Sequence, residues 1–404
     1  MKTTSPERLD VLVIGGGPIG AVAAWSAALG GARVTLVERR DVRAAPSACT
    51  GLVSPRTLDA LGASKRSVLG TIRAVEAVSP NGHRIRVRSD VAKAFVLDRI
   101  QLEQELHGRA HRAGVTIRRR TEAVSLEPGG VLLRGPEGER TLRPAVTILA
   151  TGHETALSRH ASVLAPPRTF LAAQTEVEQR AEAEDQVTVY LGTDVAPGFF
   201  GWAVPIGEGR LRVGLAVRPG ADPKECMDRL LRERFAKAPI LTRSSGIIPI
   251  GLVREPFADR LLVVGDTAGH VKPLSGGGLY IGALCGRIAG RKAARAALSG
   301  QTGHQDLADY GIACERAVGS ELRYGLAARA LLEALSDREM DEALEAVDHP
   351  DLLRFLAEVG DIDRLRLIPR KLATEPSLWK RLLPLLTLLD GYLDGPDGSG
   401  SIAA

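Results

Sequence analysis

The stretch DVLVIGGGPIGAVAAWSAALGGARVTLVERR (Asp10–Arg40) decides the fold class. VLVI is rich in strand-forming residues, Ala21–Leu29 is helix-forming, and VTLVE is apolar up to an acid. This pattern predicts a strand, a glycine turn, a helix and a second strand. Such a βαβ unit indicates a Rossmann-like parallel sheet and an α/β fold class.

Three glycines at the predicted strand-to-helix turn have the spacing G-x-G-x-x-G: Gly15, Gly17 and Gly20. The first permits the turn, the second admits a pyrophosphate against the backbone, and the third lets helix and strand pack closely. Glu38 closes the second strand and can accept hydrogen bonds from an adenosine ribose. The unit predicts a dinucleotide site but leaves NAD and FAD open, since both share this fingerprint. We find no second G-x-G-x-x-G between a strand and a helix, which argues against a separate nicotinamide domain.

Consecutive glycines precede an apolar helix in VVGDTAGHVKPLSGGGLYIGALCG (Val263–Gly286). Each glycine loses more backbone freedom on folding than any other residue, so the run Gly276–Gly278 costs local stability. We expect either a close approach of a ligand to this backbone or a sharp bend of the chain. Asp266, at the end of the preceding predicted strand, favours the ligand.

The order of these motifs resembles the geranylgeranyl reductase family, a branch of the flavoproteins with the p-hydroxybenzoate hydroxylase fold. The resemblance rests on the N-terminal fingerprint, Asp98-Arg99, the ATG of Ala150–Gly152 and GDTAGHVKPLSGGGLY. It implies that Asp266 bonds the ribityl chain of FAD and that the loop Pro273–Gly278 passes beside the flavin ring. The cofactor-binding residues that it implies are Gly15, Gly17, Gly20, Glu38, Arg99, Gly152, Asp266, Pro273, Gly276, Gly277 and Gly278.

A cysteine-containing stretch, SACTGLVSPRTLDALG (Ser47–Gly62), resembles the family's Cys-x-Gly-x-x-Ser loop through Cys49, Gly51 and Ser54. The resemblance implies that this loop lies on the substrate side of the flavin. We therefore predict Cys49 as a catalytic residue that tunes the flavin or assists proton delivery. A buried small residue is the alternative, because free cysteine often fills a core.

An aromatic stretch, APGFFGWAVPIGEGRLRVGLAV (Ala196–Val217), resembles the family's Tyr-x-Trp-x-Phe-Pro signature in a chain with 4% aromatic residues. Phe200 and Val204 replace the Tyr and Phe of the signature, which removes a hydroxyl but keeps an apolar wall. The resemblance implies that Phe200, Trp202 and Pro205 bind substrate and that Trp202 also acts in catalysis. Simple core packing is the alternative. Two further departures are Lys272, where the family commonly has a small polar residue, and Gly277, where an acid is frequent.

The predicted architecture is α/β, and α+β overall, with an inserted antiparallel-sheet substrate domain. The expected parts are an FAD-binding domain (1–75, 95–165 and 245–300), the substrate domain (76–94 and 166–244), a C-terminal helical region (301–390) and a flexible tail (391–404). The apolar stretch LWKRLLPLLTLLDGYL (Leu378–Leu393) either packs into the core or touches a membrane.

Composition excludes several classes of protein. The four cysteines, Cys49, Cys226, Cys285 and Cys314, lack zinc or iron–sulfur spacing, so we expect no metal and a reduced, cytoplasmic setting. The net charge of +5 is spread among acids, so we expect no nucleic-acid partner. VLVI is too short for a signal peptide, and no apolar run of about 18 residues occurs. We expect a protein that is soluble or peripheral to the membrane.

The function implied by the resemblance is FAD-dependent reduction of carbon–carbon double bonds in a polyprenyl lipid of the geranylgeranyl type or an isoprenoid quinone. The rivals are an FAD monooxygenase or halogenase of a small aromatic, an electron-transfer flavoprotein acting on quinone, and a non-catalytic FAD-binding protein. The Cys49 loop and the Trp202–Pro205 strand favour the reductase. The electron donor stays open between NAD(P)H, ferredoxin and another donor.

Overall fold

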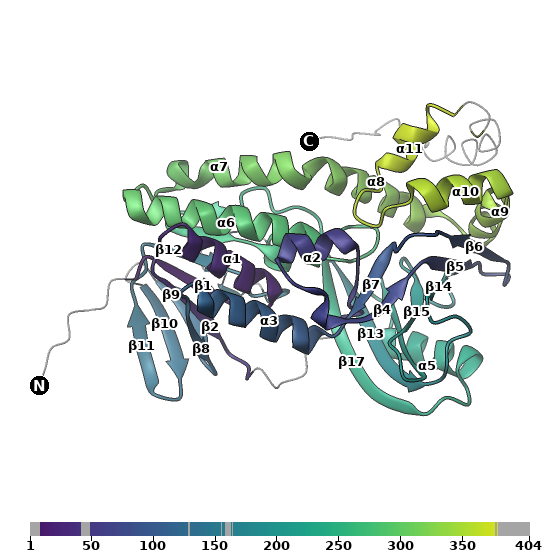
Figure 1. Cartoon of the computed structure of the whole chain (residues 1–404), viewed down its shortest axis with the longest axis horizontal. Coiled ribbons are helices and arrows are strands. Elements are labelled where there is room, and N and C mark those ends of the chain that lie inside the picture. The colour runs from purple at the N-terminus through teal and green to yellow at the C-terminus, as the bar shows by residue number, and fades with distance from the viewer. Residues whose placement is uncertain are drawn as a thin grey trace, which may run out of the picture.

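The computed structural model describes residues 9–41, 49–127, 130–154, 156–157, 163, 165–375 and 378. Strands of this part of the chain form four sheets, and helices cover them (Figure 1). The predicted tail 391–404 lies outside the described residues, as does nearly all of the apolar stretch Leu378–Leu393.

A six-stranded sheet has the order β18-β19-β12-β1-β2-β8. The strands are β1 (Val11–Ile14), β2 (Val34–Glu38), β8 (Thr116–Arg119), β12 (Val146–Leu149), β18 (Phe257–Ala258) and β19 (Leu261–Val263). Every pair in the run from β19 to β8 is parallel, and β18 joins antiparallel at the edge. With helix α1 (Pro18–Leu29) between β1 and β2, the predicted βαβ unit is confirmed.

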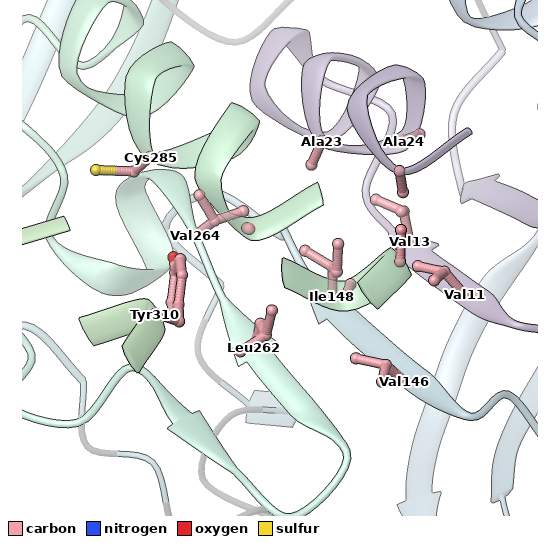
Figure 2. Packing of buried hydrophobic residues seen from close by; sticks show 14 of the residues in the cluster. Val11, Val13, Ala23, Ala24, Val146, Ile148, Leu262, Val264, Cys285 and Tyr310 are labelled. Atoms are coloured by element: carbon pink, nitrogen blue, oxygen red, sulfur yellow. The ribbon is translucent and has the colours of Figure 1, made fainter. Parts of the chain in front are cut away.

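The central strand β1 is buried on both faces because successive side chains point to opposite sides of a sheet. Val11 and Val13 pack into one core with residues of α1 and of α6 (Leu279–Ser299) (Figure 2). Leu12 and Ile14 pack on the other side against a three-stranded antiparallel sheet. Its strands are β9 (Glu122–Glu127), β10 (Gly130–Gly135) and β11 (Gly138–Leu142). The parallel sheet is therefore the middle of three layers.

Helices α1 and α6 pack in close contact. A Cβ at Gly290 of α6 would collide with Ala23 O of α1, so the glycine is what allows this spacing. Helix α3 (Arg99–Arg112) flanks α1, and its buried residues include Leu102, Leu106 and Ala110. These contacts fix the first turns of α1, α3 and α6 relative to one another.

A seven-stranded sheet has the order β17-β13-β16-β15-β14-β5-β6. The strands are β5 (Ala74–Val78), β6 (Arg84–Arg88), β13 (Arg168–Glu178), β14 (Gln186–Tyr190), β15 (Gly201–Pro205), β16 (Arg210–Val217) and β17 (Ile240–Ile250). Its pairs are antiparallel except for β14 with β5. Helix α5 (Pro223–Arg234) packs on one face. The predicted antiparallel sheet is therefore present.

A small sheet, β3-β7-β4, connects the two large ones. It contains β3 (Leu52–Val53), β4 (Val68–Ile72) and β7 (Ala94–Leu97), with helix α2 (Pro55–Leu61) and the 3-10 turn η1 (Lys65–Ser67) between β3 and β4. β3 pairs with β7 at Leu52↔Val96, and α3 begins two residues after β7 ends. The pairing of β3 with β7 thus brings the cysteine stretch, which leads into β3, close to Arg99, which follows β7.

Helices follow α6 to the end of the described chain: α7 (His304–Cys314), the π-helical turn η3 (Glu315–Gly319), α8 (Ser320–Ala334), α9 (Asp337–Val347), α10 (Pro350–Val359) and α11 (Leu367–Leu372). Figure 1 shows α7 beside α6 and α10 near β6. Among the residues that the structure describes, no helix is both long and apolar enough to cross a bilayer. The predicted helical character after residue 300 is confirmed for this part.

Candidate cofactor and substrate site

The β1–α1 turn holds the fingerprint glycines. Gly15 has φ +105°, and a Cβ there would collide with Ala150 O. A Cβ at Gly20 would collide with Gly15 O, so neither position has space for a methyl group. At Gly17, no atom of the described residues lies within 4 Å of the Cβ position. This open space at the N-terminus of α1, where helix N–H groups lack partners, suits a phosphate.

Glu38 at the end of β2 lies beside the same turn. Its carboxylate accepts hydrogen bonds from Gly16 N at 2.7 Å and from Arg40 N at 2.8 Å. The side chain of Arg40 adds an ion pair at 3.2 Å. These bonds hold the carboxylate at the carboxyl end of the strand, where the ribose of a dinucleotide binds in this type of fold.

Asp266 follows β19 in the short 3-10 helix η2 (Gly265–Ala268). Its half-buried carboxylate receives no hydrogen bond from the part of the chain that the structure describes. Burial raises the pKa of Asp266, and the nearby charges of Arg99 and His153 lower it in part. A Cβ at Gly278 would lie 2.7 Å from Asp266 Oδ1, so this glycine keeps space beside the carboxylate. The carboxylate is free to accept hydrogen bonds from a ligand.

Arg99 begins α3, directly after the N-cap residue Asp98. Its guanidinium pairs with Glu103 at 3.0 Å and interacts with the thiol of Cys49. Burial lowers the pKa of Arg99, but its interactions with Cys49 and Glu103 outweigh burial and the net shift is upward. Arg99 Nε is buried without a hydrogen-bond partner among the described residues. The structure therefore brings Arg99, Asp266 and Cys49 into one electrostatic neighbourhood.

The segment Lys272–Gly278, here named the glycine loop, is a closed turn before α6. Gly276 N donates to Lys272 O at 2.8 Å, and Lys272 N donates to Gly277 O at 3.1 Å. A Cβ at Gly277 would lie 2.9 Å from Lys272 Cε, so the lysine stem covers this glycine. At Gly276 (φ +72°) a Cβ would lie 3.3 Å from Phe199 Cζ. The glycine loop thus contacts the aromatic stretch directly.

Phe199 and Phe200 directly precede β15, and Trp202 is the second residue of that strand. These three residues are here named the aromatic row. Ring centroids are 4.7 Å apart for Phe199 and Phe200 and 6.1 Å apart for Phe200 and Trp202. Trp202 faces Gly214 across the β15–β16 pair, and a Cβ at Gly214 would collide with the indole. Trp202 Nε1 is buried without a partner among the described residues.

Pro205, the third predicted substrate-binding residue, is placed differently. It is buried at the end of β15, opposite Leu211, and is three residues from Trp202, so its side chain leaves the other face of the sheet. Phe200 and Trp202 are therefore linked through ring contacts to Phe199, which lies against the glycine loop, and Pro205 is not.

The segment Cys49–Ser54, here named the cysteine loop, is fixed to the seven-stranded sheet. Arg212 of β16 donates from Nη1 to Thr50 O at 2.7 Å and pairs with Glu176 of β13 at 2.9 Å. Thr50 Oγ1 donates to Gln174 Oε1 at 3.3 Å. Cys49 itself is half-buried. The large sheet thus positions the thiol beside Arg99.

Comparison with known proteins gives consistent results. Residues 10–89 match a family model described as FAD dependent oxidoreductase. The chain is 32% identical over 376 residues to digeranylgeranylglycerophospholipid reductase 2 of Methanothermobacter thermautotrophicus, covering 89% of this chain and 96% of that protein. It is also 32% identical over 395 residues to the reductase of the same name from Methanopyrus kandleri, covering 92% and 98%. The chain belongs to the geranylgeranyl reductase family of FAD-dependent oxidoreductases.

Solved structures agree with this fold. A geranylgeranyl bacteriochlorophyll reductase-like protein from Thermoplasma acidophilum superposes with a TM-score of 0.80 at 24% identity, covering 94% of this chain and 99% of that one. The p-nitrophenol 4-monooxygenase PnpA of Pseudomonas putida reaches 0.68 at 17% identity, covering 92% and 98%. The p-hydroxybenzoate hydroxylase-like fold is thus confirmed, and it is shared by enzymes of different chemistry.

The residues of this family member fit FAD. The open positions at Gly17 and Gly152 have no described atom within 4 Å of a Cβ, and Thr267 fixes the second by donating to Gly152 O at 2.8 Å. Asp266 and Arg99 Nε offer an unpaired acceptor and an unpaired donor. A cofactor with phosphates and a hydroxyl-rich chain satisfies these groups. FAD is the cofactor of the enzyme, and the roles of the individual residues stay predictions.

Sequence reasoning missed Asp363 and its contacts with two residues that the motifs had singled out, Ser54 and Lys272; these three residues are here named the polar latch. Lys272 Nζ donates to Asp363 Oδ1 at 2.7 Å and to Ile362 O at 2.9 Å. Ser54 Oγ donates to the other oxygen of Asp363, whose side chain is 1% exposed. The latch ties the glycine loop and the cysteine loop to the segment between α10 and α11. The unusual pair Lys272 and Gly277 was the available signal, because a lysine stem needs the space over that glycine.

A buried cluster of His270, Cys285 and Cys314 places potential ligand atoms within 4.8 Å of one another. Gly265 N donates to His270 Nδ1 at 3.2 Å, so this ring nitrogen is an acceptor. A histidine that binds metal donates from its other ring nitrogen, and this ring has the opposite polarity. Burial lowers the pKa of His270 to about 4, which keeps the ring neutral. The geometry is that of a hydrogen-bonded core cluster.

Proposed function

We propose that this reductase saturates carbon–carbon double bonds in the polyprenyl chains of a lipid, with a geranylgeranyl-type glycerophospholipid as the first candidate and an isoprenoid quinone as the second. The observation that carries the proposal is the match over nearly the full length to proteins named digeranylgeranylglycerophospholipid reductase, at 32% identity. The site geometry supports it independently.

The wall beside the glycine loop is apolar and suits a hydrocarbon chain. Trp202 packs with Leu52 of the cysteine loop, Val204 and Ile362 in one cluster. Phe199 and Phe200 continue this surface toward the glycine loop. Burial of a chain contributes about 0.8 kcal/mol per CH₂, so part of a polyprenyl group supplies the binding energy. We infer that the chain lies along the aromatic row.

The chemistry needs a hydride and a proton at the two carbons of an alkene. Bound FAD, once reduced, supplies the hydride. The residues of the chain hold the reactants: the fingerprint glycines bind phosphate, Asp266 accepts from hydroxyl groups, and the aromatic row orients the alkene. An unactivated alkene offers no charged oxygen to stabilise, so positioning supplies much of the rate.

For the proton, we propose Cys49 Sγ. The thiol lies beside the guanidinium of Arg99, in the same neighbourhood as Asp266. Arg212 and Glu176 hold the backbone of the cysteine loop in place while this occurs. A Cys49→Ser variant keeps a hydroxyl of much higher pKa, so the alkene should be reduced far more slowly while FAD binding persists.

The test of the proposed function is anaerobic. Chemically reduced enzyme is mixed with a geranylgeranyl glycerophospholipid or with a prenyl quinone, and reoxidation is followed at the visible absorption band of the flavin. Products that gain two hydrogens per reduced bond by mass spectrometry support the proposal. A reduced enzyme that ignores every polyprenyl lipid, yet consumes oxygen and hydroxylates or halogenates a small aromatic, places it instead with the monooxygenases that share its fold.

We also propose contact with the membrane surface, because the proposed substrate is a lipid. We propose a cytoplasmic location, because the four free cysteines fit a reducing compartment. Sedimentation with vesicles made of the substrate lipid tests the contact. The electron donor is identified by comparing anaerobic flavin reduction by NADH, NADPH and reduced ferredoxin, and a donor that gives no reduction is eliminated.

A further inference from the structure

Arg329 of α8 is a fully buried cation in a part of the chain where the sequence motifs predict no site residue. Its side chain is 0% exposed. Burial lowers the pKa of Arg329 to about 10. Its nearest carboxylate, Glu333, lies 4.0 Å away and also pairs with Arg168 at 2.5 Å. A buried charge without a close counter-ion is costly, so the contacts that compensate it need explanation.

Backbone carbonyls from two separate loops accept the hydrogen bonds of this guanidinium. Arg329 Nε donates to Pro273 O at 3.0 Å, and Nη2 donates to Leu274 O. Both acceptors belong to the glycine loop. Arg329 Nη1 donates to Gly198 O at 2.8 Å, directly before the aromatic row. The rigid fork of an arginine can satisfy three acceptors at once, which a lysine point charge cannot do in the same geometry.

The aromatic row rests on the same group. The guanidinium carbon lies 3.9 Å from the ring centroid of Phe199 and 5.3 Å from that of Phe170. Leu326 of α8 packs in the same cluster as Phe199 and Trp202. A cation over a desolvated ring is attracted by the negative face of the ring. Arg329 therefore fixes the ring of Phe199 as well as the carbonyl before it.

Helix α8 contacts the glycine loop a second time. A Cβ at Gly325 would lie 2.8 Å from Pro273 Cδ. Positions 325 and 329 are four residues apart and share one face of the helix. The face of α8 thus approaches Pro273 without space for a methyl group at one position and bonds its carbonyl at the other.

We propose that Arg329 is a positioning residue that sets the distance between the glycine loop and the aromatic row, and so between the flavin and the alkene. The part that concerns the flavin rests on the cofactor alone, and the part that concerns the alkene rests on the proposed function. Arg329 touches neither reactant and acts through Pro273, Leu274 and Phe199.

The test compares Arg329→Met and Arg329→Lys, both loaded with FAD. The fingerprint glycines are untouched, so FAD content stays near that of the wild type. We expect a shifted visible absorption band in both variants, because the backbone beside the flavin moves. Reoxidation of the reduced enzyme by a polyprenyl lipid should slow by roughly 10²-fold, since a displacement of about 1 Å has that effect. Lysine should restore little, because it keeps the charge but loses the fork.

Arg168→Met is the matched control. Arg168 is also an arginine near Phe170, at 5.4 Å, and it shares Glu333, but its side chain is 44% exposed and no bond to the glycine loop is described. Its absorption band and rate should equal those of the wild type. If Arg329→Met does not fold, Gly325→Ala pushes Pro273 from the same helix and should shift the band with the guanidinium intact.

Folded Arg329 and Gly325 variants with a wild-type absorption band and a wild-type rate overturn the proposal. A wild-type enzyme that fails to reduce polyprenyl lipids overturns the proposed function but leaves the absorption band as a valid test of the position of the loop. The two failures are therefore distinguishable.

Discussion

The two ends of the cofactor site are built in different ways. At the fingerprint end, Gly15, Gly17, Gly20 and Glu38 come from one stretch of the chain, and their fit depends on backbone atoms. At the loop end, the glycine loop is held by buried ionic side chains from far along the chain, chiefly Asp363 and Arg329.

Substitutions at the two ends of the site should therefore have different effects. A methyl group added at the fingerprint end meets either backbone or open ligand space, so it affects folding or cofactor binding. A side chain removed at the loop end leaves a buried partner unsatisfied, so it affects stability and the reaction while the fingerprint stays intact.

Gly17→Val should weaken FAD binding without unfolding the protein. No described atom lies within 4 Å of the Cβ position, so the new side chain fits the protein and overlaps the ligand. Overlap in a packed site costs on the order of 1–3 kcal/mol, which weakens FAD binding by up to roughly 10²-fold. The measurement is the ratio of flavin to protein absorbance, with thermal unfolding of the FAD-free protein beside it.

Gly20→Ala is the contrasting variant at the same turn. Its Cβ would collide with Gly15 O, so it should lower the stability of the FAD-free protein. The division fails if Gly17→Val keeps full FAD, or if the two variants behave alike in the absence of cofactor.

Lys272→Met should lower the free energy of unfolding by about 3–5 kcal/mol, because it removes the ion-pair partner of the buried Asp363 and leaves Ser54 as its remaining side-chain hydrogen-bond partner among the described residues. The double variant Lys272→Met/Asp363→Leu should regain much of the loss, since no buried charge remains. Arg134→Met breaks the exposed pair with Glu139 and should cost less than about 1 kcal/mol. Denaturant unfolding of all three variants measures these differences. Equal costs for the buried and exposed pairs would contradict the account of the polar latch.

Trp202→Ala should slow the anaerobic reoxidation of reduced enzyme by a polyprenyl lipid by about 10-fold to 10²-fold, through the loss of an apolar contact of roughly 1–3 kcal/mol. FAD content should stay unchanged. Trp202→Phe should lose less, because a ring remains over Gly214. Trp25→Phe, in α1, serves as the control for a tryptophan outside the aromatic row. A rate as fast as that of the wild type in Trp202→Ala would remove the residue from the substrate wall.

Asp361→Asn tests the ion pair between Arg56 and Asp361, which lies beside the polar latch. Burial raises the pKa of Asp361, but hydrogen bonds from Arg56 and from the Asp363 backbone outweigh it, and the folded-state pKa falls below the ordinary 3.8. The charge therefore stabilises the fold above pH 3.8, and this contribution is lost as the pH falls through the folded pKa. The variant should be about 1 kcal/mol less stable at pH 7, discounted for partial exposure. The urea midpoints of the wild type and of Asp361→Asn should converge as the pH falls. A gap that stays constant with pH would contradict the lowered pKa of Asp361.

Sequence reasoning reached the fingerprint end because every residue there belongs to one local pattern. The spacing of Gly15, Gly17 and Gly20 and the acid at Glu38 are set by a βαβ unit, whose geometry follows from short-range rules. Asp266 and the glycine loop were found for the same reason, since strand, acid, glycines and helix follow one another directly.

The contacts of the loop end were beyond the reach of such patterns. Asp363 meets Lys272 across 91 residues, and Arg329 meets Pro273 across 56. Arg329 shares its helix with Arg323, which is exposed, and no local feature of the sequence separates the two. Pro205 stays a prediction as a substrate-binding residue. A motif assigns neighbouring residues to one role, whereas a strand sends alternate side chains to opposite faces, and Pro205 points to the face opposite that of Trp202.

The strand order of the parallel sheet affects when the nascent chain can fold and bind its cofactor. β1 pairs with β12, and β12 pairs with β19, which ends at Val263. When the fingerprint glycines have been synthesised, strands β12 and β19 of the same sheet have not yet been translated. Helix α6, which covers the sheet, is complete only at Ser299. Pairing across such separations is slow, because the chain must close long loops before contacts repay the entropy. We expect FAD to enter a nearly complete polypeptide, and cells short of flavin to accumulate full-length rather than truncated chains awaiting cofactor.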